Sequence, residues 1–233
     1  PQLALLIRLG AIASLATMSA LIKAASESGV HLLEILFWRQ ALAIPVLAGW
    51  AWATARSLAV FRTTRPGAHL RRSLTGLLGM VLNFTGIVML PLAEATTMGF
   101  TAPIWAVILS MLLLKDQVGI WRWSAVLLGF VGILLIAQPG SGHLPLLGAS
   151  VALGGAFMIA LISIQIADLN KTEQPMTIVF WFAVTATPIC ALGLRFVFTA
   201  HSGWQWLLLL AMGLMGTLGQ ILLTTSLRFG KVS

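Results

Sequence analysis

The sequence has few charged residues. Only 9% of its 233 residues are charged and 59% are hydrophobic, whereas a soluble domain has about 25% charged and 45–50% apolar residues. Apolar runs of roughly twenty residues recur along the chain, and a helix of that length crosses a hydrocarbon layer of about 30 Å. Nothing alternates in polarity as the ~10-residue strands of a membrane β-barrel would. The deficit of charge therefore excludes a soluble core and predicts an all-α polytopic membrane protein.

Cysteine and acidic residues are also scarce. The single cysteine, Cys190, excludes an intramolecular disulfide and any metal site built from cysteines. The six acidic residues are dispersed, and only Asp168 and Glu173 lie near each other in a connection, so the clustered carboxylates that bind a metal or a diphosphate are missing. No predicted strand leads into a Gly-Lys-Ser/Thr motif, which excludes a P-loop nucleotide site. We expect no cofactor and no metal.

The apolar runs predict eight membrane-spanning helices. One long run, from Ser73 to Leu114, would be about twice the membrane thickness as a single helix, and Pro91 with Glu94 marks the turn that divides it. The predicted spans are Leu3–Ala24, Leu32–Ala53, Ser73–Leu90, Ala93–Leu114, Trp121–Ala137, Leu144–Ala167, Met176–Val197 and Trp204–Leu227.

Positive charge gathers in alternate connections. If the amino end is cytoplasmic, the cytoplasmic connections hold ten of the fourteen Lys and Arg residues, counting Arg122, and the outer connections hold none. An excess of Lys and Arg in short loops marks the cytoplasmic side. The arginines between residues 56 and 72 are not interleaved with stacking aromatics, apart from Phe61. We interpret the net charge of +8 as a topology signal, and we expect no nucleic-acid partner.

Two phrases of the sequence occur twice. FWRQALAIPVL (37–47) and FWFAVTATPIC (180–190) both begin Phe-Trp and carry a proline eight positions after that phenylalanine, and residues 76–96 resemble residues 213–233. Helices 1 to 3 thus recur as helices 6 to 8, so the repeating unit is five helices. A unit with an odd number of helices inserts its second copy upside down, as in secondary transporters. The sequence predicts an inverted repeat, with copies at 1–138 and 144–233.

The stretch MLPLAEATTMGFTAPIWAVILSMLLLKDQVGIWRWSAVLLGFVGILLIAQPG (89–140) resembles the EamA-type repeat of the drug/metabolite transporter superfamily. The shared features are a Leu-Pro-x-Ala-x-Ala entry, a proline followed by aromatics, and a glycine-rich fifth helix. The resemblance extends over essentially the whole chain. It implies ten helices with both termini cytoplasmic, in a bacterial inner membrane. Because the chain begins at Pro1 without methionine and stops at Ser233, we expect a fragment that lacks helices 9 and 10.

The resemblance and the repeat together predict a secondary transporter. It would move a small metabolite or drug-like solute by alternating access, with export favoured and with the site between the two repeats near the bilayer midplane. The expected partners are the lipid bilayer and a small-molecule substrate, and proton coupling stays open. An integral-membrane enzyme acting on lipid or prenyl substrates is the alternative, and a receptor or channel is a third possibility. The sequence does not predict the substrate, the coupling ion or the oligomeric state.

Arg39 is a charged residue inside an apolar run, and its position there needs an explanation. An arginine inside a membrane helix costs about 2.5–3.5 kcal/mol on insertion scales and more in simulations. Arg39 either snorkels toward the outer interface and meets Glu34, or it faces a polar cavity and binds an anionic group. Glu34 is accordingly a counter-ion or a proton site. The sequence alone leaves these alternatives open.

Five other residues are cavity candidates. Asn83 and Gln220 lie near the middle of their spans, where an unsatisfied amide is costly, so each should face another helix or a wet cavity. Trp38, Trp105 and Trp181 are candidates to line a pocket for organic cations or apolar solutes. Lipid contact or core packing is the alternative for each tryptophan.

Prolines and glycines indicate where helices bend and where they pack. Pro45, Pro103 and Pro188 are expected in mid-helix, where each removes a hydrogen bond and bends its span. With Glu34 and Glu94 they are the candidates for coupling and gating. Glycines at three-residue spacing are expected at close helix contacts. They are Gly76, Gly79, Gly129, Gly132, Gly213, Gly216 and Gly219.

Overall fold

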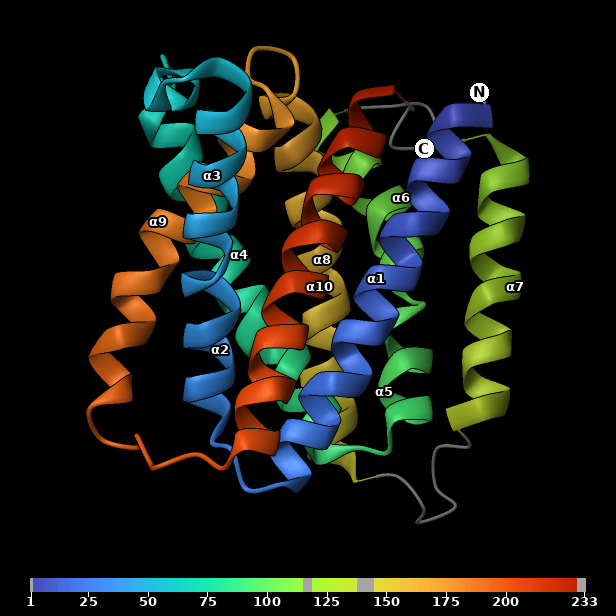
Figure 1. Ribbon diagram of the computed structural model, residues 1–233. Coiled ribbons are helices and arrows are strands. Elements are labelled where there is room, and N and C mark those ends of the chain that lie inside the picture. The colour runs from blue at the N-terminus through green and yellow to red at the C-terminus, as the bar shows by residue number, and fades with distance from the viewer. Residues whose placement is uncertain (1, 115–118, 138–144, 230–233) are drawn as a thin grey trace. The chain divides into compact units, whose positions relative to one another are not determined.

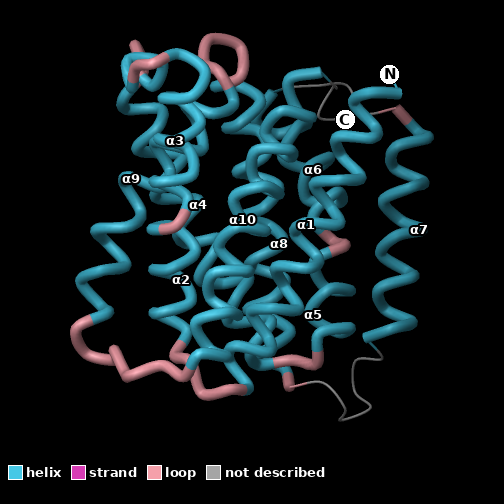
Figure 2. The backbone as a smooth tube through the Cα atoms, viewed as in Figure 1, coloured by secondary structure: helices cyan, strands magenta, loops and turns pink. Residues whose placement is uncertain are grey.

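A computed structural model describes residues 2–114, 119–137 and 145–229, and most of them lie in helices joined by short connections (Figures 1 and 2). Seven helices of this described part are long and apolar enough to cross a membrane, which confirms the all-α polytopic fold. The elements are α1 (Gln2–Glu27), α2 (Leu32–Ala41), α3 (Ala43–Ala55), the 3-10 helix η1 (Leu58–Phe61), α4 (Pro66–Met89), α5 (Leu92–Gly99), α6 (Ala102–Leu114), α7 (Ile120–Ala137), α8 (Leu146–Leu169), α9 (Pro175–Leu194) and α10 (Gly203–Phe229).

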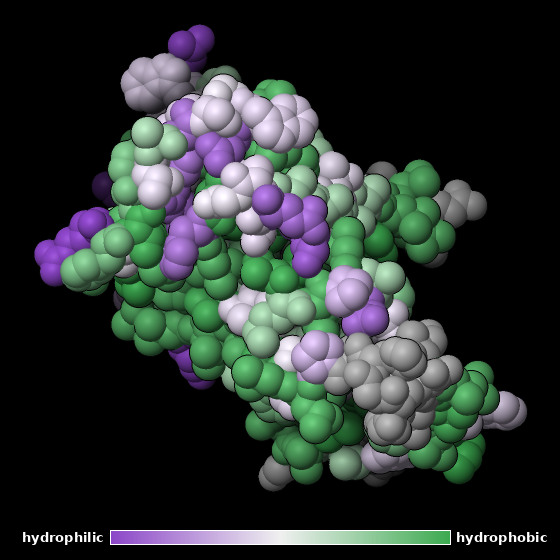
Figure 3. Space-filling model, turned by 90° about the horizontal axis from the view of Figure 1, so that it is seen from below, coloured by the Kyte–Doolittle hydropathy of each residue, from purple (hydrophilic) through white to green (hydrophobic). Residues whose placement is uncertain are grey.

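Large apolar side chains remain exposed along the helices. On α1, Leu5 and Leu6 are 60% and 65% exposed, and on α7 Leu128 is 80% exposed. Figure 3, which views the molecule from below, shows hydrophobic residues over much of the visible surface, with hydrophilic residues among them. Soluble monomers rarely expose apolar patches larger than a few hundred Å². Exposed apolar side chains of this kind agree with a protein that lies in a lipid bilayer.

The chain divides into two compact units. Unit 1 comprises Pro1–Leu74 and Gln165–Lys231, and unit 2 is built on Thr75–Ile164. Unit 1 thus holds α1, α2, α3, η1, α9 and α10 with the adjoining ends of α4 and α8, whereas unit 2 holds the remainder of α4 and α8 with α5, α6 and α7. Each unit draws on both predicted repeats. The repeat boundaries at 1–138 and 144–233 describe sequence similarity and stay a prediction.

In unit 1, α1 and α10 approach closely at the glycines of α10. A Cβ atom on Gly219 would lie 2.8 Å from the side chain of Leu15 and 3.3 Å from its backbone nitrogen, and one on Gly216 would lie 2.8 Å from the sulfur of Met18. Gly213 likewise faces a neighbouring side chain. The missing side chains let the helices come together, so the packing predicted for these three glycines is confirmed.

In unit 2, α4 and α8 pack with their backbones close together. A Cβ atom on Gly155 would lie 3.1 Å from the backbone of Asn83, and one on Gly79 would lie 2.9 Å from Met158. The packing predicted for Gly79 is confirmed. Gly132 shows no such contact, because among the described residues nothing beyond its chain neighbours and its own helix backbone lies within 4 Å of its Cβ position.

Two predicted spans are each divided into two helices shortly before a proline. α2 and α3 meet at Leu42, which keeps helical dihedral angles (φ −69°, ψ −23°), and a short turn separates α5 from α6. Pro45 and Pro103 therefore lie in the first turns of α3 and α6, where a missing N–H costs little, and not in mid-helix as predicted. Pro188 does lie inside a continuous helix, α9.

α4 begins earlier than predicted, at Pro66 instead of Ser73. Proline suits the first helical position because its fixed φ is already helical and its missing N–H would have no partner there. His69 and Arg72, which the sequence placed in a connection, therefore lie on the helix and are only 1% and 2% exposed. Arg72 is therefore a buried helix residue, and the topology interpretation of the basic connection stays a prediction.

Candidate functional site

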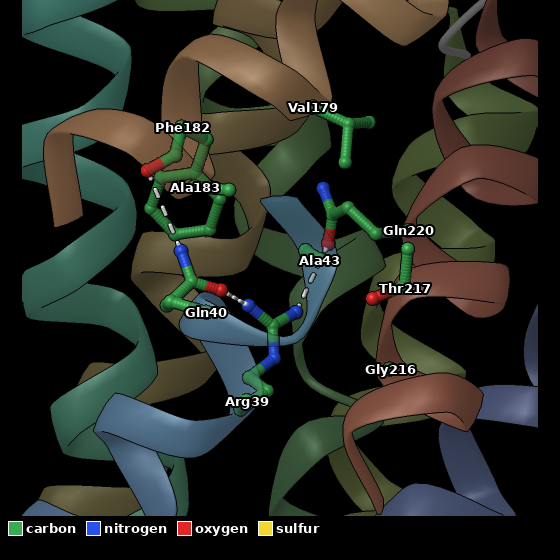
Figure 4. A pocket seen from close by; sticks show the side chains of 9 residues that line it. All are labelled: Arg39, Gln40, Ala43, Val179, Phe182, Ala183, Gly216, Thr217 and Gln220. Atoms are coloured by element: carbon green, nitrogen blue, oxygen red, sulfur yellow. Dashed lines mark hydrogen bonds between the residues drawn. The ribbon is translucent and has the colours of Figure 1, made fainter. Parts of the chain in front are cut away.

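Unit 1 contains a small polar cavity where α2, α3, α9 and α10 meet (Figure 4). Its volume is about 10 Å³, which is about the space of one water molecule. The guanidinium of Arg39 lies between the side-chain amides of Gln40 and Gln220. The lining residues are Arg39, Gln40, Ala43, Val179, Phe182, Ala183, Gly216, Thr217 and Gln220.

Arg39 is buried, and its guanidinium is held within the helices. Nη1 donates a hydrogen bond to Oε1 of Gln40, and Nη2 donates to Oε1 of Gln220 at 3.4 Å. Hydrogen bonds to a charged group contribute roughly 1.5–3 kcal/mol, which offsets part of the cost of burying the arginine. The snorkelling interpretation, in which Arg39 reaches outward to Glu34, is wrong. Arg39 and Gln220 do line one cavity, and their binding of a solute stays a prediction.

The ring of Phe182 lies beside two buried guanidinium groups. The Cζ atom of Arg39 is 5.8 Å from the ring centroid and that of Arg72 is 4.5 Å from it. Gln40 also donates from Nε2 to the backbone oxygen of Phe182 at 3.5 Å. A cation near an aromatic face gains about 0.5–2 kcal/mol. Phe182 occupies the position that matches Arg39 in the second repeated phrase, so two matched positions contact each other.

The α10 side of the cavity is shaped by small residues. A Cβ atom on Gly216 would lie 3.4 Å from Cγ and 3.5 Å from Nε of Arg39. Thr217 donates its hydroxyl to the backbone oxygen of Gly213 at 2.8 Å, within its own helix. The glycine therefore leaves room for the arginine stem, and one turn later Gln220 supplies the amide that meets its head.

One end of unit 1, where α1 meets α2 and α9 meets α10, holds a buried pair of a glutamate and a histidine. Nε2 of His201 lies 2.5 Å from Oε2 of Glu34, and both side chains are 0% exposed. The other carboxylate oxygen, Oε1, accepts the backbone N–H of Thr199 at 3.2 Å. Both oxygens of Glu34 are thus engaged by the connection 195–202. The partner of Glu34 is His201 and not Arg39.

Aromatic rings surround this pair. His201 meets Trp206 edge-on at 5.2 Å and Phe198 at 5.8 Å, and Trp206 in turn meets Trp38 at 5.0 Å. Trp38 therefore belongs to the end of the unit and does not line the cavity.

The opposite end of unit 1 holds a second polar cluster. Nη2 of Arg65 lies 2.6 Å from Oδ2 of Asp168. Oγ1 of Thr63 donates to Oε1 of Glu173 at 2.5 Å, and Nε2 of His69 lies 3.8 Å from the same oxygen. These contacts join the connection between α3 and α4 to the connection between α8 and α9.

Trp181 belongs to this second end. Its indole Nε1 donates to the backbone oxygen of Phe61 at 2.9 Å, and its ring lies 5.7 Å from that of His69. Trp181 therefore anchors η1 and is not among the residues that line the cavity at Arg39.

Three further candidates belong to unit 2. Asn83 lies where the backbone of α4 meets Gly155 of α8, and the ring of Trp105 meets that of Phe157 edge-on at 5.5 Å. Glu94 lies in the first turn of α5, and its buried Oε2 has no hydrogen-bond partner among the described residues. None of them lines the cavity of unit 1.

Sequence reasoning missed Gln40, Arg72 and His201. Gln40 carried a signal, because it is a second polar residue directly after Arg39 in an apolar run. His201 carried none, since only the fold brings the connection 195–202 to Glu34. In the part of the chain that the structure describes, no group of three or more His, Cys, Asp and Glu side chains could hold a metal ion.

Comparison with known proteins identifies a family to which the chain is similar. Residues 2–138, more than half of the chain, match the model of a family described as the EamA-like transporter family. A solved crystal structure of another protein superimposes with a TM-score of 0.70 over 97% of this chain and 79% of that one. The two sequences are 20% identical, so this likeness concerns the fold alone.

Several curated relatives are named as transporters. The riboflavin transporter of Rhizobium johnstonii is 30% identical over 81% of this chain and 62% of its own length. The pseudopaline exporter CntI of Pseudomonas aeruginosa is 32% identical over 89% of this chain and 72% of its own. The S-adenosylmethionine uptake transporter of Rickettsia felis is 25% identical over 81% and 63%. The chain thus spans less than two thirds of the riboflavin and S-adenosylmethionine relatives.

Proposed function

The chain belongs to the EamA-like transporter family of the drug/metabolite superfamily, and we propose that the complete protein is a secondary transporter in a bacterial inner membrane. It moves a small metabolite or drug-like solute by alternating access. Its amino terminus is cytoplasmic, in keeping with the positive charges of the alternate connections. The relatives are named as transporters, and we propose no enzymatic role.

The cavity around Arg39 is the observation that carries this proposal. Ionisable residues inside membrane helices are costly and mark solute or ion pathways. The cavity takes Arg39, Gln40 and Ala43 from the first predicted repeat and its other lining residues from the second. A site between two repeats is the arrangement that alternating access uses. The forked guanidinium between two amides suits a carboxylate or another anionic group.

Matched contacts support the inverted repeat. Trp38 and Trp181 hold the same place in the two repeated phrases, and His69 and Trp206 each lie seven positions before a matching Gly-x-x-Gly. Trp38 contacts Trp206, and Trp181 contacts His69. Equivalent positions thus meet at opposite ends of unit 1, as a two-fold axis in the membrane plane would place them.

A second matched pair supports the same relation. Glu34 accepts from the N–H of Thr199, whereas its counterpart Thr177 donates to the oxygen of Val60 at 3.2 Å. Each contact joins the start of a helix of one repeat to the connection that closes the same end of unit 1. The side chains differ, so the two ends share this arrangement but are built from different residues.

Alternating access requires the cavity to enlarge. A space of about 10 Å³ is far below the ~300–1,000 Å³ of small-molecule sites, so the described form is closed around Arg39. Pro188 lies inside α9 and removes one of its backbone hydrogen bonds, whereas Pro45 and Pro103 lie where one predicted span divides into two helices. All three are our candidates for the places where helices flex. Glu34 and Glu94 are our candidates for proton coupling.

The names of the relatives indicate a class of solute, small metabolites, but no single compound. Those compared above are named for riboflavin, pseudopaline and S-adenosylmethionine, three different metabolites. We propose export as the direction, which agrees with the name of the pseudopaline exporter. Because the S-adenosylmethionine relative is named for uptake, the direction of transport has to be measured.

Counterflow in liposomes tests the function. The full-length protein is reconstituted and loaded with one unlabelled solute at a time, from a panel of riboflavin, S-adenosylmethionine, amino acids, nucleotide sugars and quaternary amines. We expect saturable entry of the same labelled solute, well above that of protein-free liposomes. A protein that exchanges no solute but modifies a lipid or prenyl compound would be an enzyme, and the proposal would be wrong.

A further inference from the structure

We propose that Glu34 and His201 form a proton-binding site that keeps one end of unit 1 closed, and that a change in its proton count opens the way from that end to the cavity. The assignment of a path to the cavity rests on the proposed transport function. The assignment of the proton site rests on the geometry of the pair.

The pair fixes a connection onto a helix. Glu34 lies at the start of α2, and both its oxygens contact the connection 195–202, through the N–H of Thr199 and the imidazole of His201. Gln205, in the first turn of α10, adds a neutral link at this end, because its Nε2 donates to the oxygen of Ser28, in the connection between α1 and α2, at 2.8 Å. Of these links, only the contact between Glu34 and His201 joins two side chains that can each gain or lose a proton.

Complete burial sets the number of protons that the closed pair holds. A carboxylate and a neutral imidazole together carry one negative charge. One added proton, on either group, makes the pair neutral in total. A second proton, or the loss of the first, leaves one uncompensated charge on two side chains that are 0% exposed. An unpaired charge away from water is strongly unfavourable. Opening the end to water relieves that cost, so the closed form is favoured only while the pair holds one proton.

The surroundings of His201 strengthen this dependence. Its buried Nδ1 has no hydrogen-bond partner among the described residues, and the rings of Phe198 and Trp206 meet it edge-on. Among the described residues, the carboxylate of Glu34 is the charged group that contacts this imidazole. The other charged or titratable side chains of the helix ends gathered here are His31, the Lys23–Glu27 pair and Arg195.

The histidine at the opposite end differs in its surroundings. Glu173 lies 3.8 Å from His69 and also accepts the hydroxyl of Thr63, and the Arg65–Asp168 pair lies in the same cluster. A change of charge on His69 therefore has other polar groups to balance it. For this reason the proposal concerns the pair of Glu34 and His201 alone.

Accessibility of the cavity to a thiol reagent tests the proposal without any solute. Thr217→Cys, in the full-length protein with other cysteines such as Cys190 replaced, places a thiol on the cavity wall. A membrane-impermeant reagent is added on the side of the connection 195–202, between about pH 5 and pH 9. Rates are divided by those of Ala200→Cys, an exposed position, which removes the effect of pH on the thiol itself.

We expect the normalised rate to pass through a minimum and to rise on either side by up to about tenfold per pH unit, as opening coupled to one proton requires. Glu27→Gln is the matched control, since that acid lies at the same end but is 68% exposed, and it should keep the profile. The double variant Glu34→Gln with His201→Gln removes both charges together and should give a flat profile. Exchanging the two residues, Glu34→His with His201→Glu, should restore the minimum.

A flat profile in the parent protein, or a minimum that persists in a folded double variant, would overturn the proton site. This outcome is distinct from failure of the transport proposal. If labelling depends on pH as expected but no solute exchanges in liposomes, the proton site holds and the transporter assignment is wrong. If solute exchanges normally while labelling ignores pH, only the proton site is wrong.

Discussion

At the scale of single residues, the sequence revealed which side chains are unusual but not what they contact. Arg39 and Glu34 stand out because charge is rare in apolar runs, and both prove buried. Their partners lie far along the chain, at Gln220 and His201. No local pattern indicates which distant helix or connection packs on a given face. The polar character of the site could therefore be predicted, whereas its pairing could not.

Trp181 illustrates the same limit and gives a prediction. Trp181→Phe keeps an aromatic ring but removes the donor to the oxygen of Phe61. An unsatisfied buried carbonyl costs about 1–3 kcal/mol, so we expect a lower free energy of unfolding in detergent and an unchanged KM for solute. Trp52→Phe, at a position 59% exposed, is the control and should change neither. A raised KM at unchanged stability would instead place Trp181 in the solute path.

At the scale of helices, the spacing of glycines predicted close helix contacts, whereas the positions of prolines did not show where one helix ends and the next begins. The glycines of α10 lie at close helix contacts as predicted, Gly216 and Gly219 against α1 and Gly213 against Leu42, although their spacing did not indicate which helix packs there. The expectation of mid-helix prolines at Pro45 and Pro103 was wrong, because each lies where a new helix begins. Apolar composition continues across both interruptions, so hydropathy alone cannot locate them.

The glycine face of α10 can be tested by stability. Gly219→Ala adds a methyl group 2.8 Å from the side chain of Leu15 and 3.3 Å from its backbone nitrogen, and such overpacking costs about 1–3 kcal/mol. Gly49→Ala in α3 is the matched control, since nothing lies within 4 Å of that Cβ position, and it should stabilise by about 0.5–1 kcal/mol. Thermal unfolding in detergent measures both. A Gly219→Ala protein as stable as Gly49→Ala would contradict the close packing of α1 and α10.

At the scale of the whole molecule, membrane class and family followed from the sequence, because composition and motifs are local properties. The division into compact units did not follow from the sequence. Unit 1 joins residues 1–74 to residues 165–231, and such pairings are set by which helices bury one another. The repeated phrases still anticipated that both halves contribute to one cavity. The cavity is where the sequence repeat and the folded unit coincide.

The most direct test of this account is solute counterflow by Arg39→Gln in the full-length protein, once the panel has identified a transported solute. Loss of a charged hydrogen-bonding group at a binding site costs about 1.5–3 kcal/mol, which corresponds to a fall of about 10- to 100-fold in Vmax/KM. Arg195→Gln, which removes an exposed charge at the end of α9, should stay within about twofold of the parent. An Arg39→Gln protein that is folded and transports with unchanged Vmax/KM would contradict the central claim that solute passes through the cavity at Arg39.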